Sequence, residues 1–323
     1  MHYRSRSLFL AAALVLFAAT VLAQEYPTKA VRMIGPSSPG GGIDTNGRIL
    51  AAYFTQSMGQ QFILENRPGA GGRIGTELAS KAPPDGYTLL LSAAAAMTIH
   101  PNTYKSIPYD PVRDFAPISL VALSEYILAV HPSLPVKSVK DLVALARRKP
   151  GMLNYGSAGT GSFTHLAMAL LTSMTGVEMA HVPYKGSTQA SMGVMTGEAQ
   201  LLFSSPAAVL GQVKEGRLRA IGVSGTTRTA ILPEVPTIAE AGVAGYDATS
   251  WYGMLAPAGM PRAALSKLSE ESARALGTAD LKERLLFQGI DPAKGGAEEF
   301  AAVLKTEIPK WEKVIKAAKI PPQ

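Results

Sequence analysis

The stretch GPSSPGGGID, Gly35 to Asp44, follows a short apolar run at residues 30–34 and precedes apolar residues at helical spacing from Ile43 to Phe54. Three consecutive glycines therefore stand where a strand is predicted to turn into a helix. The first turn of a helix has backbone N–H groups without partners and the positive end of the helix dipole. Glycines let a ligand approach those donors closely, so the turn is a candidate anion site. A tight turn that only needs positive φ angles is an equal alternative.

The N-terminus has the pattern of a secretory signal peptide. Arg4 and Arg6 precede an apolar run from Leu8 to Val21, and Val21-Leu22-Ala23 supplies a small-residue cleavage site. The apolar run is too short for a comfortable membrane span. We therefore expect residues 1–23 to be removed after Ala23, and the mature chain to be soluble and exported.

Composition narrows the class of protein. The chain has 323 residues and no cysteine, which excludes disulfides and thiolate metal sites. The length that remains after the signal predicts two domains. The formal net charge is +7, and the basic residues are scattered apart from Arg147-Arg148-Lys149. No basic stripe is interleaved with aromatics, so nucleic acid is not expected as a partner. A mild positive field favours anionic solutes.

The opening pattern recurs in the middle of the chain. A predicted strand at 153–155 leads into the Gly/Ser-rich turn Gly156 to Ser162, and a helix follows from Phe163. Predicted strands alternate with predicted helices on both sides of about residue 123. This alternation predicts two mainly parallel, doubly wound α/β units.

The C-terminal part is helical after a predicted strand at Trp251 to Pro257, and it has no sheet of its own. We expect it to return to the first unit, so that the chain crosses between units near residues 123–126 and again near 249–251. This predicts lobe 1 at residues 24–124 plus 250–323 and lobe 2 at residues 125–249. Two crossings make a hinge with a cleft between the lobes. Ligands of such sheets bind beyond the carboxyl ends of the strands.

Catalytic signatures are missing from the sequence. It contains no Gly-x-Ser-x-Gly, no P-loop and no His-Glu-x-x-His. The histidines after the signal have no metal-type spacing, namely His100, His131, His165 and His181. We therefore expect a protein that is not an enzyme and that uses no metal or other cofactor.

Seven motifs, taken in order, resemble the solute receptors of tripartite tricarboxylate transporters, also called the Bordetella uptake gene family. They are Tyr26-Pro27 with Pro39-Gly40-Gly41 and Asp44, Glu65 to Gly72, Tyr109 to Pro117, Ser157 to Ser162 with His165-Leu166, Val182 to Gly186, Pro233 to Thr237, and Trp251 to Pro257. The resemblance implies a type II periplasmic binding-protein fold of two doubly wound α/β lobes with a ligand cleft, and no catalysis. It also implies delivery of the solute to a membrane permease of one large and one small subunit. We expect the receptor to be monomeric.

Carried over by position, the turns Ser37 to Asp44 and Ser157 to Ser162 would hold one ligand carboxylate from opposite lobes. Alternatives remain for single residues: a hydroxyl of the second turn could merely cap its helix, and Asp44 could either cap a helix or hold a ligand amine or a water. His165 is interpreted as a packed side chain. The full set of candidate ligand-binding residues is Ser37, Ser38, Gly40, Gly41, Asp44, Ser92, Ala93, Ser157, Thr160, Gly161, Ser162, Tyr184, Ser204 and Ser205.

The run Ala93 to Ala96 offers few donors for a second or third carboxylate. Because an unpaired buried carboxylate is costly, we expect a small carboxylate with a modest apolar or aromatic body, and citrate-like ligands to be disfavoured. Two other functions stay open from the residues alone. One is an exported enzyme on the same scaffold, and the other is a ligand-sensing subunit for a membrane receptor kinase.

Overall fold

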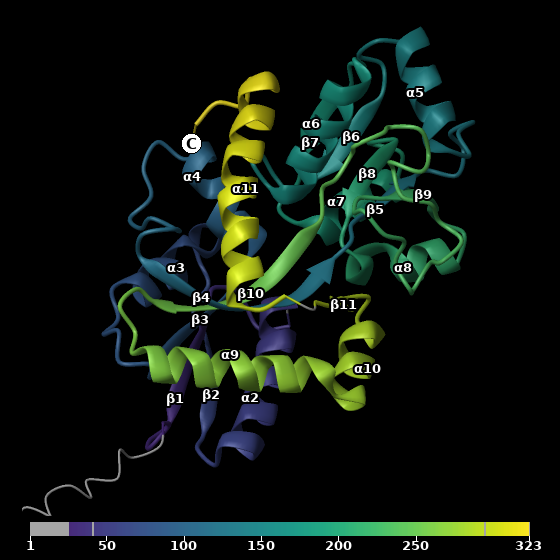
Figure 1. Ribbon diagram of the computed structural model, residues 1–323. Coiled ribbons are helices and arrows are strands. Elements are labelled where there is room, and N and C mark those ends of the chain that lie inside the picture. The colour runs from purple at the N-terminus through teal and green to yellow at the C-terminus, as the bar shows by residue number, and fades with distance from the viewer. Residues whose placement is uncertain (1–25, 41, 294, 323) are drawn as a thin grey trace, which may run out of the picture.

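The computed structural model describes residues 26–40, 42–293 and 295–322. Within them the chain forms two α/β lobes, each a sheet with helices on both faces (Figure 1). This confirms the predicted fold class. The predicted signal peptide and Gly41 lie outside the described residues.

The first lobe is built on a six-stranded sheet in the order β11-β4-β10-β3-β1-β2. Its strands alternate between two apolar layers: Val31 and Met33 pack with one set of helices, and Ile34 packs with the other. The first layer contains α2 (Gly42–Met58), α9 (Arg262–Gly277) and α10 (Ala279–Phe287), and the second contains α3 (Arg73–Ser80), α4 (His100–Thr103) and α11 (Ala297–Ala317). The strands are β1 (Val31–Gly35), β2 (Phe62–Asn66), β3 (Thr88–Ala93), β4 (Phe115–Ser124), β10 (Ser250–Pro257) and β11 (Asp291–Pro292), and short 3-10 and π turns occupy Ala70–Gly72 and Ala95–Ile99.

The second lobe is built on a five-stranded sheet in the order β7-β6-β8-β5-β9. Leu128 and Val130 of β5 pack against α5 (Val139–Arg148) and α6 (Phe163–Thr175), whereas Ile127 and Ala129 face α7 (Ser187–Met195) and α8 (Pro206–Lys214). Ser138 caps α5 as predicted, because its hydroxyl accepts the N–H of Asp141. The strands are β5 (Ile127–Val130), β6 (Asn154–Ser157), β7 (Ala180–Pro183), β8 (Leu201–Ser204) and β9 (Arg219–Val223).

The prediction of mainly parallel sheets is wrong for the strands next to the crossings. β10 runs antiparallel to both β3 and β4, and β5 runs antiparallel to both β8 and β9. Each of these strands enters its sheet from the other lobe, at the edge where the parallel strands end. A strand that enters there has to run in the opposite direction to its neighbours.

The same registers place the carboxyl edges of the two sheets toward each other. β4 and β3 both pair antiparallel with β10, so β4 ends at Ser124 on the edge where β1 and β3 end. β5 begins with Ile127 opposite Ser204, the last residue of β8. The crossing from Ser124 to Ile127 therefore joins the two carboxyl edges, which is where ligands of such sheets bind.

Three segments connect the lobes rather than the two predicted crossings. The first two lie side by side, since Ser250 pairs with Ser124 across the strands. The third is α11, which packs on β4 in the first lobe and on α6 in the second (Figure 1). The expectation that the tail returns only to the first unit is therefore incomplete. Trp311 of α11 is fully buried in the core of the second lobe.

Residues 115–124 form β4, a strand that no predicted element covered and that contains Pro117. Proline lacks an N–H for the ladder and is unusual in a central strand. In the structure Pro117 lies beside a register shift between Met254 and Leu255 of β10. The irregularity accommodates the missing donor within an otherwise buried strand.

Candidate functional site

A cavity of about 380 Å³ is lined from both lobes. The first lobe contributes Gly40, Gly42 and Thr45 at the start of α2, and the second contributes Ser205 and Pro206 at the start of α8. Two helix N-termini from opposite lobes therefore meet at one cavity, an arrangement that favours an anion. The remaining lining residues are Ser124, Ala207, Leu210, Gly211, Tyr252, Phe287, Gln288 and Ile290.

The carboxylate of Asp44 binds the backbone of the first turn and a side chain of α2. One carboxylate oxygen accepts the N–H of Gly40 at 2.9 Å, and the other lies 2.9 Å from Nη2 of Arg48. Burial alone would raise the pKa of Asp44, but the hydrogen bonds from Arg48 and from Gly40 outweigh it and hold the pKa below its usual value. The structure therefore favours the capping interpretation of Asp44 over a contact with a ligand amine.

The described glycines of the first turn have structural roles of their own. Gly40 has a φ of +81°, which side chains rarely adopt. A Cβ on Gly42 would overlap the hydroxyl of Tyr252, so this glycine makes room for a side chain of β10. Positive φ, one of the two alternatives for the glycine run, therefore applies at Gly40, and Tyr252 is the side chain that approaches Gly42. Approach of a ligand to this turn stays a prediction.

The second turn, Ser157 to Ser162, is bonded largely within its own lobe. Ser157 is fully buried, and its hydroxyl lies 2.6 Å from Nε2 of His181 and accepts the N–H of Gly159. Ser162 caps α6, because its hydroxyl accepts the N–H of His165. The capping alternative is therefore correct for Ser162.

The other predicted site residues are spread over the carboxyl edges of both sheets. Ser92 and Ser204 are fully buried at the ends of β3 and β8, and Ala93 lies opposite Tyr252. Ser38 is exposed at the first turn and Thr160 at the second. The structure brings Gly40 and Ser205 to the same cavity. The lining of that cavity includes none of Ser37, Ser38, Asp44, Ser92, Ala93, Ser157, Thr160, Gly161, Ser162 and Ser204.

Tyr184 is not among the residues that line the interlobe cavity, and its contact with a ligand stays a prediction. Its ring packs into the core of the second lobe, where Gly156 and Gly193 leave space for it. A Cβ on Gly193 would overlap the phenol oxygen. The half-buried ring of Tyr184 therefore packs against its own lobe, and its hydroxyl has no hydrogen-bond partner within the described residues.

Several residues that line the cavity were not predicted. Tyr252 belongs to the Trp251 to Pro257 motif, so the resemblance contained a signal for it. Thr45 follows Asp44 directly and could have been included with the turn. No sequence signal indicated Phe287. It lies at the end of α10, far along the chain from both turns, and is 91% exposed.

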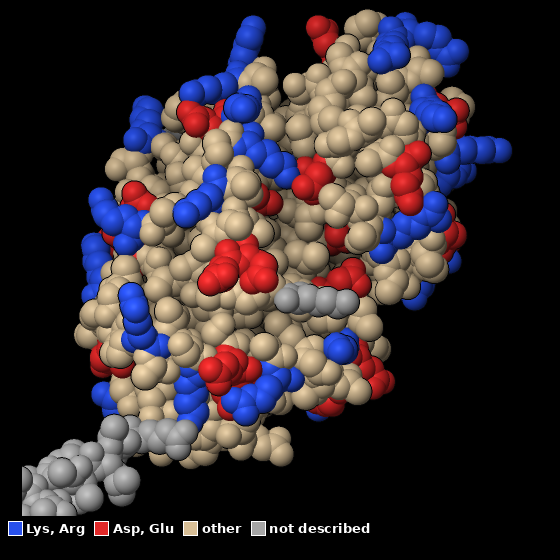
Figure 2. All heavy atoms as spheres, in the orientation of Figure 1, with Lys and Arg blue, Asp and Glu red and all other residues tan. Residues whose placement is uncertain are grey.

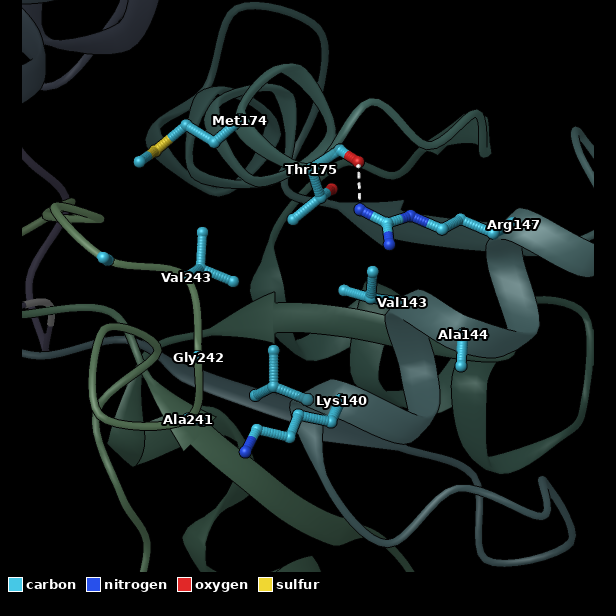
Figure 3. A pocket seen from close by; sticks show the side chains of 11 residues that line it. Lys140, Val143, Ala144, Arg147, Met174, Thr175, Ala241, Gly242 and Val243 are labelled. Carbon is cyan, nitrogen blue, oxygen red and sulfur yellow. Dashed lines mark hydrogen bonds between the residues drawn. The ribbon is translucent and has the colours of Figure 1, made fainter.

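A second cavity, of about 400 Å³, lies on the outer side of the second lobe (Figure 3). It is lined by α5, the end of α6 and residues 241–244. Arg147 points across it and donates from Nη2 to the carbonyl of Thr175 at 3.1 Å, which caps the end of α6. Because its walls come from one lobe, movement of the lobes cannot enclose a ligand there.

Figure 2 shows basic and acidic side chains interspersed over one face of the molecule. No helix among residues 26–40, 42–293 and 295–322 combines the length and apolar character needed to cross a membrane. The same residues contain no group of three His, Asp or Glu side chains placed to hold a metal ion.

Residues 47–320 match the sequence profile of the tripartite tricarboxylate transporter family receptor. The chain is 33% identical over 300 residues to protein BugT of Bordetella pertussis, covering 93% of this chain and 92% of that protein. Among solved structures it is similar to Rpa4515 of R. palustris with adipate, at 36% identity and a TM-score of 0.81, covering 92% and 100% of the two chains. It is also similar to MatC of Rhodopseudomonas palustris with bound malate, at 27% identity and a TM-score of 0.75, covering 90% and 100%.

Proposed function

The chain belongs to the tripartite tricarboxylate transporter receptor family, and we propose that it captures a small carboxylate between its two lobes and delivers it to a membrane permease of one large and one small subunit. Its similarity to proteins solved with adipate and with malate supports a carboxylate as the ligand. The interlobe cavity lies within the size range of small-molecule sites.

The observation that carries the proposal is a pair of unpaired buried hydroxyls at the facing edges. The hydroxyl oxygens of Ser37 in the first lobe and Ser204 in the second are buried and have no hydrogen-bond partner within the described residues. Buried polar groups are nearly always hydrogen-bonded, so each is expected to bond a molecule that enters between the lobes. A ligand carboxylate is an acceptor for both.

The test is a binding panel of adipate, malate and citrate on the wild type and on Ser204→Ala. We expect a dicarboxylate to bind more tightly than citrate, and Ser204→Ala to weaken binding by about 1.5–3 kcal/mol, roughly ten- to 150-fold in Kd. Ser191→Ala is the matched control, because Ser191 also has a buried unpaired hydroxyl but lies on α7. Calorimetry that finds equal losses in both variants, or tightest binding of citrate, would contradict the proposed site.

We further propose that the lobes close on the ligand, with the crossings at Ser124–Ile127 and Ala248–Ser250 as the hinge. A ligand that contacts both lobes favours the arrangement in which both contacts are made. The expected result is a smaller radius of gyration in X-ray scattering when adipate saturates the protein. Scattering curves that stay superimposable at saturating adipate would speak against closure.

The remaining assignments are part of the same proposal. Lobe 1 comprises residues 24–124 and 250–323, lobe 2 comprises residues 125–249, and α11 contacts both. The predicted cleavage after Ala23 would place the mature chain in the periplasm, where a receptor of this family meets its permease. The receptor acts as a monomer without a cofactor, and the binding free energy is used for lobe closure rather than for chemistry.

A further inference from the structure

Two histidines form a stacked pair beneath the second turn. The rings of His165, on α6, and His181, on β7, have centroids 3.8 Å apart and planes within 8°. Tyr155 of β6 continues the stack, with its ring centroid 5.0 Å from that of His181. His165 is buried at 7% exposed, whereas His181 is half-buried on β7, the strand at the edge of the sheet. Nothing in the function proposed above uses the pair.

Each imidazole is bonded to a different end of the turn. Nδ1 of His165 accepts the backbone N–H of Gly161 at 3.1 Å, and Nε2 of His181 lies 2.6 Å from the hydroxyl of Ser157. That hydroxyl in turn accepts the N–H of Gly159 at 3.1 Å. The pair therefore holds the backbone of the turn at two points, one before and one after its middle.

The bond from Gly161 requires a neutral His165 with its proton on Nε2. A protonated ring has a donor at both nitrogens and cannot accept this N–H. Burial, and next to it the neighbouring His181, lowers the pKa of His165 to about 4, and burial lowers the pKa of His181 to about 4. Two parallel rings at this spacing would also repel each other if both were charged. The groups that face the pair are Tyr155 and Ser157, and both are uncharged at neutral pH.

We propose that His165 and His181 are positioning residues that hold the second turn in its ligand-receiving conformation through their neutral ring nitrogens. The inference rests on the proposed function, because the turn matters to a ligand only if the protein binds one between its lobes. It goes further by assigning a role to two histidines that contact the turn from inside the lobe.

The variants that test this separate hydrogen bonding from packing. His165→Asn retains an acceptor near the position of Nδ1, whereas His165→Leu retains volume and loses the acceptor. His181→Gln likewise retains a polar group near the position of Nε2, whereas His181→Leu does not. A positioning role predicts that Asn and Gln preserve the turn and that both leucine variants lose it. A packing role predicts the reverse order, since leucine fills an apolar space better than a small amide.

The first readout needs no ligand. In ¹⁵N-labelled protein, hydrogen exchange of the Gly161 amide is expected to accelerate about tenfold in His165→Leu and to change little in His165→Asn. The Gly72 amide, which donates to Gly69 in the first lobe, is the internal control and should not change. Long-range imidazole spectra should show a neutral His165 protonated at Nε2 down to about pH 5. Equal exchange in the two variants, or the opposite tautomer, would overturn the inference whether or not a ligand is known.

The second readout uses adipate as the probe. Adipate itself takes up protons below about pH 6, so its affinity for the wild type is compared at each pH with its affinity for His165→Asn. The ratio of the two affinities should be flat between about pH 8 and 6 and should shift against the wild type toward pH 4 together with the Gly161 resonance, because protonation removes the acceptor only in the wild type. Affinity that rises on acidification would show that the charged pair attracts the anion, and would overturn the positioning role. If adipate does not bind at all, the proposed function fails while the exchange measurement still decides the inference.

Discussion

Trp311→Ala is expected to lower the free energy of unfolding by about 3–5 kcal/mol, the usual cost of truncating a fully buried large aromatic. Trp311 is carried by α11, whose earlier residues Phe300 and Leu304 are buried in the first lobe. The indole is wholly buried in the second lobe, with its ring centroid 5.5 Å from that of Phe163. The substitution therefore opens a cavity where α11 joins the two lobes.

Denaturant unfolding followed by fluorescence measures this directly, because the chain has two tryptophans and the variant leaves Trp251 as the reporter. The matched control is Trp311→Phe. It keeps a ring against Phe163 and removes an indole N–H that has no hydrogen-bond partner within the described residues. Its cost should be clearly smaller than that of alanine. An alanine variant that loses less than about 1 kcal/mol would show that α11 contributes little to the second lobe.

Local sequence signals predicted much of the fold. The glycine-rich turns, the apolar runs and the capping serines Ser138 and Ser162 act within a few residues, so their pattern is visible in the chain. The order and direction of strands depend on contacts between distant segments. For that reason the sequence did not reveal the antiparallel direction of β5 and β10 or the strand β4 with its Pro117.

The candidate site shows the same division. Gly40 and Ser205 were predicted and line the cavity between the lobes, and their roles toward a ligand stay predictions. Tyr184 was predicted on the strength of its place after β7, but the space left by Gly193 admits its ring to the core. His181 was not selected as a site residue, because its stacking on His165 joins two elements that no local pattern connects. Glu125, which lies at the crossing, was not selected either, because no local pattern marks it.

Glu125 is an unusual buried acid at the hinge. It lies between β4 and β5, is 1% exposed, and fits against Gly225, where a Cβ would overlap its carboxylate. Burial raises the pKa of Glu125 to about 8, and the charges of Asp247 and then Asp291 add to the effect. Lys310 lies 3.2 Å from Asp247, so this cation is paired with a different carboxylate. The surroundings of Glu125 therefore favour its protonated, neutral carboxyl.

The sign of the pH effect follows from the raised pKa. In the unfolded chain Glu125 loses its proton near its ordinary pKa of 4.5, whereas in the folded chain it keeps the proton to about pH 8. Between these values the folded state binds more protons, so stability falls as the pH rises through this window. At 1.36 kcal/mol per pH unit, Glu125 contributes about 4–5 kcal/mol to the free energy of unfolding below pH 4.5, and this contribution is lost by pH 8.

Glu125→Gln is accordingly expected to be more stable than the wild type at pH 8 by up to about 4–5 kcal/mol, and nearly equal to it at pH 4.5. Glutamine keeps the volume and an acceptor for the N–H of Gly225 but has no proton to lose. Urea unfolding at a series of pH values measures the difference. The matched control is Glu271→Gln, since Glu271 is also buried but lies 3.1 Å from Arg274. Because Glu271→Gln loses this ion pair, its free energy of unfolding at pH 8 should be equal to that of the wild type or lower. A Glu125→Gln variant that is less stable at pH 8, or whose difference from the wild type does not change with pH, would show that the hinge carboxyl is charged in the folded protein.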